Sequence, residues 1–245
     1  MFSKAVKQYI EQNNFPHFDV QAVFFDMDGV LFDSMPHHAQ AWVKAMSEIN
    51  IDFSLYEAYL HEGRTGSSTI DGAFQRTLGR DATESEKQKI YSAKTRYFED
   101  LGEVFPMPFA HELLTKIKRR GIEIYLVTGS GTATLLDNLN ASFPDIFVPE
   151  RMVTAFDVIE GKPSPEPYLM ALQKSGLQRW QVCVVENAPL GVKSANAAGL
   201  FTIAVNTGIL KDEDLSANGA NIVLPSIESL NNCWEKFNKL YVLQK

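Results

Sequence analysis

The chain has 245 residues, of which 45% are hydrophobic, and a formal net charge of −7. This length and composition allow one well-packed core, with or without a smaller second domain, and they exclude a fibrous or disordered protein. The negative charge argues against binding to nucleic acid or to an anionic membrane. Only two cysteines occur, and the first residues are too polar for a secretion signal, so we expect a monomeric protein of the reducing cytoplasm.

Short apolar runs alternate along the chain with helical patterns. Residues 1–19 predict an amphipathic helix before the core, to which the pattern assigns no role. The runs expected to form strands cover 22–26, 122–128, 181–186, 200–205 and 221–225. They are apolar at consecutive positions, as in a parallel sheet that is covered on both faces. The alternation predicts a doubly wound α/β fold, Rossmann-like, with its active site at the carboxyl ends of the strands.

One long segment interrupts this alternation. Residues 36–103 contain no convincing strand and predict four helices, over 38–49, 54–63, 67–79 and 84–102. We expect them to form an α-helical cap domain inserted into a core made of residues 1–35 and 104–245. Pro106 and Pro108 suit a stiff connection between the two, because proline restricts its own φ and the residue before it.

The first predicted strand ends in two carboxylates, Asp26 and Asp28, which are followed by Gly29. An ionised carboxylate at the end of an apolar strand is costly unless it is paired or bound to a cation, which favours a functional role. A calcium-binding loop is excluded, because the apolar residues 30–32 stand where such a loop needs oxygen ligands. Asp33 or Ser34 is expected to cap the helix that follows.

Further polar residues follow the later strands. Thr128, Gly129 and Ser130 form a turn whose hydroxyl and amide groups could hold an anion. Lys162 lies in a proline-rich loop, and Glu186 and Asn187 end another strand. Each of these features is weak alone, because glycine turns and solvated lysines are common. Their order and their positions at strand ends make the set specific.

With these motifs the chain resembles the haloacid dehalogenase superfamily, and within it the β-phosphoglucomutase-like phosphotransferases. The segment 26–34 resembles the first family motif, Thr128 the second, Lys162 the third, and Glu186 with Asn187 a modified fourth. The family's mutase also carries a histidine and a tryptophan in its first cap helix, which His38 and Trp42 match. For Trp42, we expect packing rather than catalysis.

The resemblance implies phosphoryl transfer through an aspartyl phosphate on Asp26, with Asp28 as general acid and base. Crowding three carboxylates around a phosphate requires a divalent cation, and oxygen ligands favour Mg²⁺. The expected metal ligands are Asp26, the carbonyl of Asp28, and Glu186 or Asn187. Lys162 would neutralise charge, and Thr128 would bind a phosphate oxygen.

Cap residues are candidates for binding the substrate. Besides His38, they are Arg64, which could cover a substrate phosphate, Glu62, and Lys94 as a second cation. The mutase usually carries its cap arginine where Gly66 and Ser67 lie in this chain, so sugar-phosphate specificity does not transfer directly.

Three functions remain open from the sequence. The first is phosphatase or mutase action on a small sugar phosphate in carbohydrate metabolism, which His38 and Trp42 favour. The second is hydrolysis of inorganic pyrophosphate, which needs no sugar pocket and suits Arg64, Lys94 and the missing negative charge at Asn187. The third, a regulatory phosphate-binding module, is disfavoured because such a module needs no nucleophile.

Overall fold

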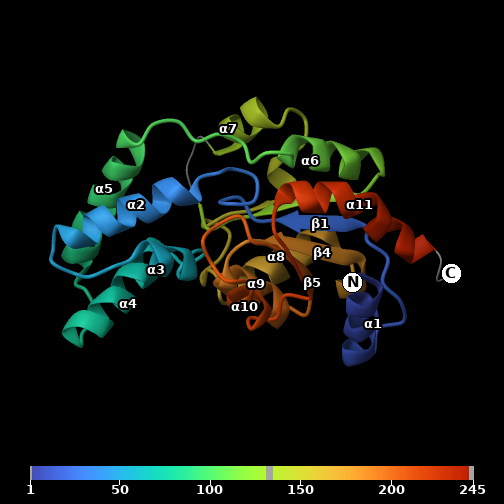
Figure 1. The fold of residues 1–245 in the computed structure, drawn as a ribbon, viewed down its shortest axis with the longest axis horizontal. Helices are drawn as coiled ribbons and strands as arrows, with labels where there is room; N and C mark the ends of the chain where they lie inside the picture. The colour runs from blue at the N-terminus through green and yellow to red at the C-terminus, as the bar shows by residue number, and fades with distance from the viewer. Residues whose placement is uncertain (1, 131–134, 243–245) are drawn as a thin grey trace.

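The computed structural model describes residues 2–130 and 135–242. Within them the strands form one six-stranded sheet in the order β3-β2-β1-β4-β5-β6, and every pairing is parallel (Figure 1). The strands are β1 (Ala22–Phe25), β2 (Glu123–Val127), β3 (Met152–Val153), β4 (Val182–Glu186), β5 (Phe201–Val205) and β6 (Ile222–Leu224). The predicted α/β fold is therefore confirmed.

All five predicted strands are present, and the sequence analysis missed β3. Its two residues continue the sheet beyond β2, pairing Leu126 with Met152 and Val127 with Val153. A strand of two residues is too short to show the apolar run by which the others were recognised.

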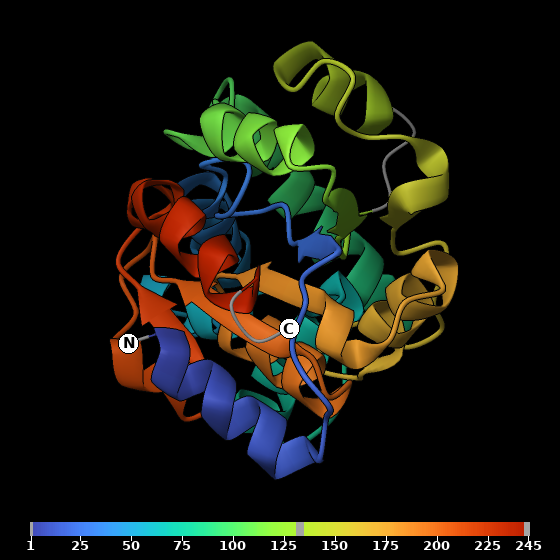
Figure 2. The same cartoon turned by 90° about the vertical axis from the view of Figure 1, so that its right-hand side faces the viewer.

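Helices cover both faces of this sheet (Figures 1 and 2). On one face, a large apolar cluster joins Val23 and Phe25 to the helices, whereas Phe24 faces the opposite cluster, as alternation along a strand requires. The first face carries α1 (Phe2–Asn13), α6 (Ala110–Arg119), α7 (Leu135–Ser142) and α11 (Ile227–Val242). The second carries α8 (Glu166–Ser175) and α9 (Pro189–Ala197), and α10 (Asp212–Ser216) follows β5. Two short 3₁₀ helices cover Pro149–Arg151 and Arg179–Gln181. No helix among the described residues is long and apolar enough to cross a membrane.

The helix α1 packs on the core, which explains its amphipathic pattern. Tyr9 is buried and its ring contacts the rings of Phe18 and Phe201. The Tyr9 hydroxyl donates to the backbone carbonyl of Gly199 at 2.8 Å. This helix thus extends the aromatic part of the core.

The four predicted helices between the first two strands are all present. They are α2 (Met35–Ser47), α3 (Leu55–Leu60), α4 (Gly66–Leu78) and α5 (Glu84–Asp100). Ser54, Thr65 and Thr83 cap the last three of them through their side-chain oxygens. These helices share their own apolar cluster, in which Trp42 is buried, and they lie beside the sheet domain (Figure 1). We propose residues 36–103 as the cap, with 1–35 and 104–245 as the core.

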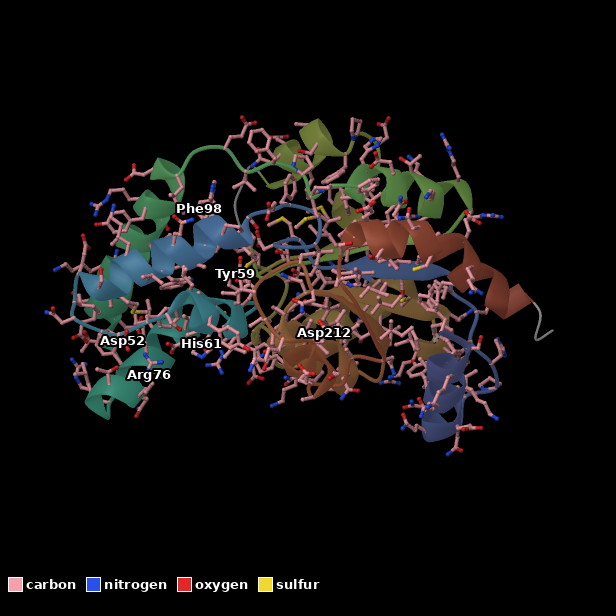
Figure 3. The ribbon with its side chains drawn as sticks, in the orientation of Figure 1. Asp52, Tyr59, His61, Arg76, Phe98 and Asp212 are labelled. Atoms are coloured by element: carbon pink, nitrogen blue, oxygen red, sulfur yellow. The ribbon has the colours of Figure 1, made fainter. Side chains whose placement is uncertain are left out.

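The cap contacts the core through the loop that follows β5. The ring of Tyr59 packs against Gly208, and Leu210 joins the apolar cluster of the cap helices. Tyr56 donates a hydrogen bond to the carboxylate of Asp214 in α10. Tyr59 lies where the two parts meet (Figure 3). The cap is therefore held over one end of the sheet.

Candidate active site

The candidate residues lie at the carboxyl edge of the sheet. Asp26 follows β1 and its amide donates to the carbonyl of Val185 in β4 at 3.0 Å. The Thr128 amide, which follows β2, donates to the carbonyl of Val153 at 2.9 Å. Because the parallel strands end at one edge, the residues that follow them come together there.

Lys162 is the centre of a buried ion cluster at this edge. Its ammonium donates to Asp26 Oδ1 at 2.6 Å, to Glu186 Oε1 at 2.6 Å and to the Val127 carbonyl at 3.0 Å. All three of its N–H donors are thus used, and the residue is only 4% exposed. Lys162 was expected to neutralise charge in the site, and the structure places it in direct contact with Asp26.

In this cluster, burial and the opposite charge of a neighbour shift the pKa values of Asp26 and Lys162 in opposite directions. Burial raises the pKa of Asp26 well above its ordinary value, Lys162 opposes this, and Glu186 and Asp28 add to it. Burial alone would lower the pKa of Lys162, but the Asp26 and Glu186 carboxylates raise it above the ordinary lysine value. Lys162 therefore stays protonated, with its positive charge between the carboxyl groups of Asp26 and Glu186.

Glu186 uses both of its carboxylate oxygens within the protein. Oε1 accepts from Lys162 and, at 2.7 Å, from the Tyr168 hydroxyl. Oε2 accepts from the amides of Asn187 at 3.1 Å and Ala188 at 3.3 Å. A side chain at Gly191 would overlap this carboxylate, so the glycine there allows the close approach of α9.

The neighbouring Asn187 has an unused oxygen, which fits a metal ligand. Its Oδ1 is buried and has no hydrogen-bond partner, although a buried polar atom normally has one. Its Nδ2 lies against Gly29, where φ is +78° and a side chain would overlap the amide. Among the described residues no group of three or more His, Cys, Asp or Glu is arranged to hold a metal, so a cation here would depend on amide and carbonyl oxygens as well. The residues present therefore fit a hard divalent cation.

Asp28 is held from the cap side. Its Oδ1 accepts from the Ser34 hydroxyl at 2.6 Å and lies 3.3 Å from His38 Nε2. His38 Nδ1 is 2.7 Å from the Lys94 ammonium, which can only donate, so the imidazole carries its proton on Nε2. Burial opposes ionisation, but His38 and Ser34 lower the pKa of Asp28 below its ordinary value. Asp28 is therefore ionised at neutral pH and able to accept a proton, which suits the expected general base; its role as general acid, which needs a proton on the carboxyl group, stays a prediction.

This contact corrects the expected helix cap. Ser34 does occupy the position before α2, but its backbone is already helical and its side chain makes no capping hydrogen bond. The hydroxyl donates to Asp28, and its oxygen caps nothing because the helical backbone of Ser34 lacks the extended conformation that a capping residue usually has.

Glu62 and Arg64 lie on the loop between α3 and α4. Burial raises the pKa of Glu62, Asp28 adds to the increase, and His38 and Lys94 oppose it, so the Glu62 carboxyl belongs to the same group of charges. Arg64 instead runs along α4, with Nη1 3.5 Å from the position of a Cβ on Gly72. Arg64 as a contact to a substrate phosphate stays a prediction.

The turn after β2 faces the cap loop. The Thr128 hydroxyl accepts from the Ser130 amide at 3.0 Å, which leaves its proton free for a phosphate oxygen. The Gly63 carbonyl oxygen lies 3.6 Å from the position of a Cβ on Gly129. A cavity of about 50 Å³ lies beside this turn. Its lining includes Gly63 and Thr65 of the cap, Thr128, Gly129 and Lys162 of the site, and the core residues Ala155, Val158, Ile159, Gly161 and Pro167.

Sequence reasoning missed several residues of the site. Ser34 was considered only as a helix cap, although it directly follows the Asp26–Asp28 motif. Tyr168 and the Val127 carbonyl carry no local signal, because their roles depend on contacts with distant strands. Thr207, whose hydroxyl donates to the Gly29 carbonyl at 2.6 Å, was missed for the same reason.

Comparison with known proteins agrees with this arrangement. The family model described as haloacid dehalogenase-like hydrolase matches residues 20–199. Hexitol phosphatase A of Escherichia coli K12 is 31% identical over 207 residues, covering 84% of this chain and 91% of that protein. The β-phosphoglucomutase of Bacillus subtilis is 26% identical, covering 89% of this chain and 97% of that protein.

A solved structure described as a putative β-phosphoglucomutase from Bacteroides vulgatus is more similar. It is 51% identical, covers 98% of both chains, and superposes with a TM-score of 0.94. The similarity thus extends over the cap as well as the sheet domain.

Proposed function

Because the chain belongs to the haloacid dehalogenase-like hydrolase family, and is an enzyme related to sugar-phosphate phosphatases and β-phosphoglucomutase, we propose that it hydrolyses a small phosphate compound through an aspartyl phosphate. Among such compounds, inorganic pyrophosphate suits the closed site best. The observation that carries this choice is the close approach of the cap loop to the site, where a Cβ on Gly63 would lie 3.3 Å from the side chain of Lys162.

In the proposed reaction, Asp26, whose ionised form Lys162 favours, attacks phosphorus through a carboxylate oxygen. The bond from phosphorus to the leaving oxygen breaks, and the second phosphate of pyrophosphate departs as the phosphate anion. Lys162 holds Asp26 Oδ1 in place and offsets the charge that gathers on the transferring group. The Thr128 hydroxyl donates to an oxygen of that group. Water then attacks the phosphorus of the aspartyl phosphate, the bond to Asp26 breaks, and the ionised Asp28 takes the proton of the water.

Mg²⁺ would be held by the Asp26 carboxylate, the Asp28 carbonyl and the unpaired Oδ1 of Asn187. When bound, the ion would neutralise phosphate charge and align the phosphoryl group. The Glu62 and Asp28 carboxyl groups repel each other electrostatically, and a nearby cation would relieve this repulsion.

Asn187→Asp should strengthen Mg²⁺ binding by about tenfold, because a carboxylate adds one negative charge beside the cation. Calorimetric titration of the protein with Mg²⁺, without substrate, measures this directly. Asn138→Asp is the matched control, since Asn138 is exposed on α7 and the same charge there should leave the affinity unchanged. Equal affinity of Asn187→Asp and the unaltered protein would exclude Asn187 as a ligand.

The substrate preference follows from the size and charge of the site. The cap loop packs closely on the edge of the sheet, because Gly63 lies against the Lys162 side chain and its carbonyl oxygen is 3.6 Å from the position of a Cβ on Gly129, which suits a substrate smaller than a hexose phosphate. The first residues of α4 are Gly66 and Ser67, where the mutase usually carries an arginine, so a distal sugar phosphate has no such contact. Lys94, which contacts His38, and the missing negative charge at Asn187 suit a compact polyanion.

Sugar phosphates are the second candidate, because the names of the relatives point to them. Phosphorus NMR of the enzyme with Mg²⁺ distinguishes the two, using pyrophosphate, β-glucose 1-phosphate and glucose 6-phosphate. We expect kcat/KM for pyrophosphate to exceed that for either ester at least about tenfold. Faster release of phosphate from the esters would favour the second candidate, and interconversion of the esters would show a mutase. The same mixtures with EDTA are the control.

A further inference from the structure

Tyr168 lies beneath the candidate site and has no role in the reaction as described. It is fully buried in the first turn of α8, and its ring is surrounded by apolar residues of the sheet. Its hydroxyl points to the ion cluster and donates to Glu186 Oε1 at 2.7 Å. A phenylalanine would fill the same apolar space, so packing alone does not explain the hydroxyl.

The Tyr168 hydroxyl and the Lys162 ammonium donate to the same oxygen, Oε1 of Glu186. Glu186 Oε1 lies 2.6 Å from the Lys162 ammonium, and the ammonium is 5.2 Å from the centre of the Tyr168 ring. Lys162 shares its charge between Glu186 and Asp26, each at 2.6 Å. Any change in the basicity or position of Glu186 must therefore shift the lysine toward or away from Asp26.

We propose that Tyr168 is a positioning residue, which holds Glu186 so that Lys162 stays equally close to Asp26. The hydroxyl supplies a second donor to Glu186 Oε1 and so weakens the hold of this carboxylate on the ammonium. Together with the Asn187 and Ala188 amides on Oε2, it prevents the side chain of Glu186 from turning. Lys162 is in this way directed at the nucleophile rather than withdrawn into the core.

The position of Lys162 does not depend on the proposed function. Only the expected fall in kcat rests on it. In Tyr168→Phe, Glu186 Oε1 keeps Lys162 as its donor, and the ammonium moves toward Glu186 and away from Asp26. Since Lys162 acts on the transferring phosphoryl group, kcat should fall by about tenfold or more, whereas KM should change little. A variant that merely loosened the fold would lower the active fraction and leave the state of Lys162 unchanged in the folded molecules.

The experiment compares Tyr168→Phe with Tyr125→Phe. Tyr125 is also buried in the sheet and donates to a carboxylate, Glu123, at 3.1 Å, but it lies away from the ion cluster. Proton–nitrogen NMR of the buried lysine ammonium reports on Lys162 whether or not the enzyme turns over any substrate, and Lys162→Met assigns its signal. We expect the signal to shift and kcat to fall only in Tyr168→Phe.

An unchanged Lys162 signal in Tyr168→Phe overturns the inference, whatever the activity. If the signal shifts but the unaltered enzyme releases no phosphate from any tested compound, the proposed function fails while the positioning role stands. If the enzyme is active and both variants lose the same small fraction of kcat, Tyr168 serves the fold alone and the inference is wrong.

Discussion

Asp26→Asn should reduce phosphate release by at least about 10⁴-fold, because an amide cannot form the phosphoryl bond on which the proposed reaction depends. The side chain keeps its size, and Lys162 keeps its contacts with Glu186 and the Val127 carbonyl. The variant should therefore stay folded. Phosphate release with each of the tested compounds gives the turnover, and incubation with labelled substrate followed by acid quenching measures phosphate bound to the protein.

Asp28→Asn is the matched variant for this test. It removes the same charge two residues away and retains the nucleophile, so turnover should fall while labelled phosphate still accumulates on the protein. Asp26→Asn should carry no label. Turnover that survives Asp26→Asn, or label that persists in it, would show that another residue attacks the phosphorus.

Lys162→Met should lower the free energy of unfolding by about 3–5 kcal/mol, because it leaves Asp26 and Glu186 buried together without their cation. Methionine preserves most of the volume and the apolar stem of the lysine. Urea unfolding in the absence of Mg²⁺ measures the change. Activity should be lost as well, since nothing else among the described contacts of Asp26 brings a side-chain positive charge to it.

The loss of unfolding free energy in Lys162→Met should depend on pH in a defined direction. Burial already raises the pKa of Asp26, and removing Lys162 raises it further, so the folded variant holds a proton that the unfolded chain releases. A carboxyl group of this kind destabilises the fold above its unfolded pKa and ceases to do so as pH falls through that value. The stability deficit should therefore be larger at neutral pH than in acid.

A surface lysine provides the comparison. Lys174 donates to the Met152 carbonyl at 2.6 Å and to Asp157 at 2.8 Å, which resembles the contacts of Lys162, but its side chain is 27% exposed. Lys174→Met should cost only about 0–1 kcal/mol, because solvent screens the pair. Equal losses in the two variants would mean that the Lys162 cluster contributes no more than a surface ion pair.

Much of the fold was predictable from the sequence, because local patterns of apolar residues distinguish strands from helices. The five apolar runs became β1, β2, β4, β5 and β6, and the four cap helices occur where their periodicity placed them. The two-residue β3 was missed, since nothing in Met152 and Val153 distinguishes a strand from a loop. The position of α1 on the core was also not predictable, because an amphipathic pattern shows that a helix has a partner and not which one.

For the site, the sequence singled out Asp26, Asp28, Lys162 and Thr128 as candidates through their order and their positions at strand ends, and the structure places Lys162 in contact with Asp26. The sequence could not assign separate roles to Glu186 and Asn187, which are adjacent in the chain. In the fold, Glu186 uses both oxygens on Lys162, Tyr168 and two amides, whereas Asn187 retains an unpaired oxygen. Backbone direction at the end of β4 creates this difference.

Apolar periodicity was thus enough to predict the fold class, and the resemblance of the motifs was enough to suggest the family. Both are properties of the linear chain. Only the tertiary structure brought His38, Glu62 and Lys94 of the cap to Asp28, directed Arg64 along α4, and limited the space beside Lys162. These features depend on how a separate helical unit packs against the sheet. Such packing results from many contacts between residues far apart in sequence, and no local pattern encodes it.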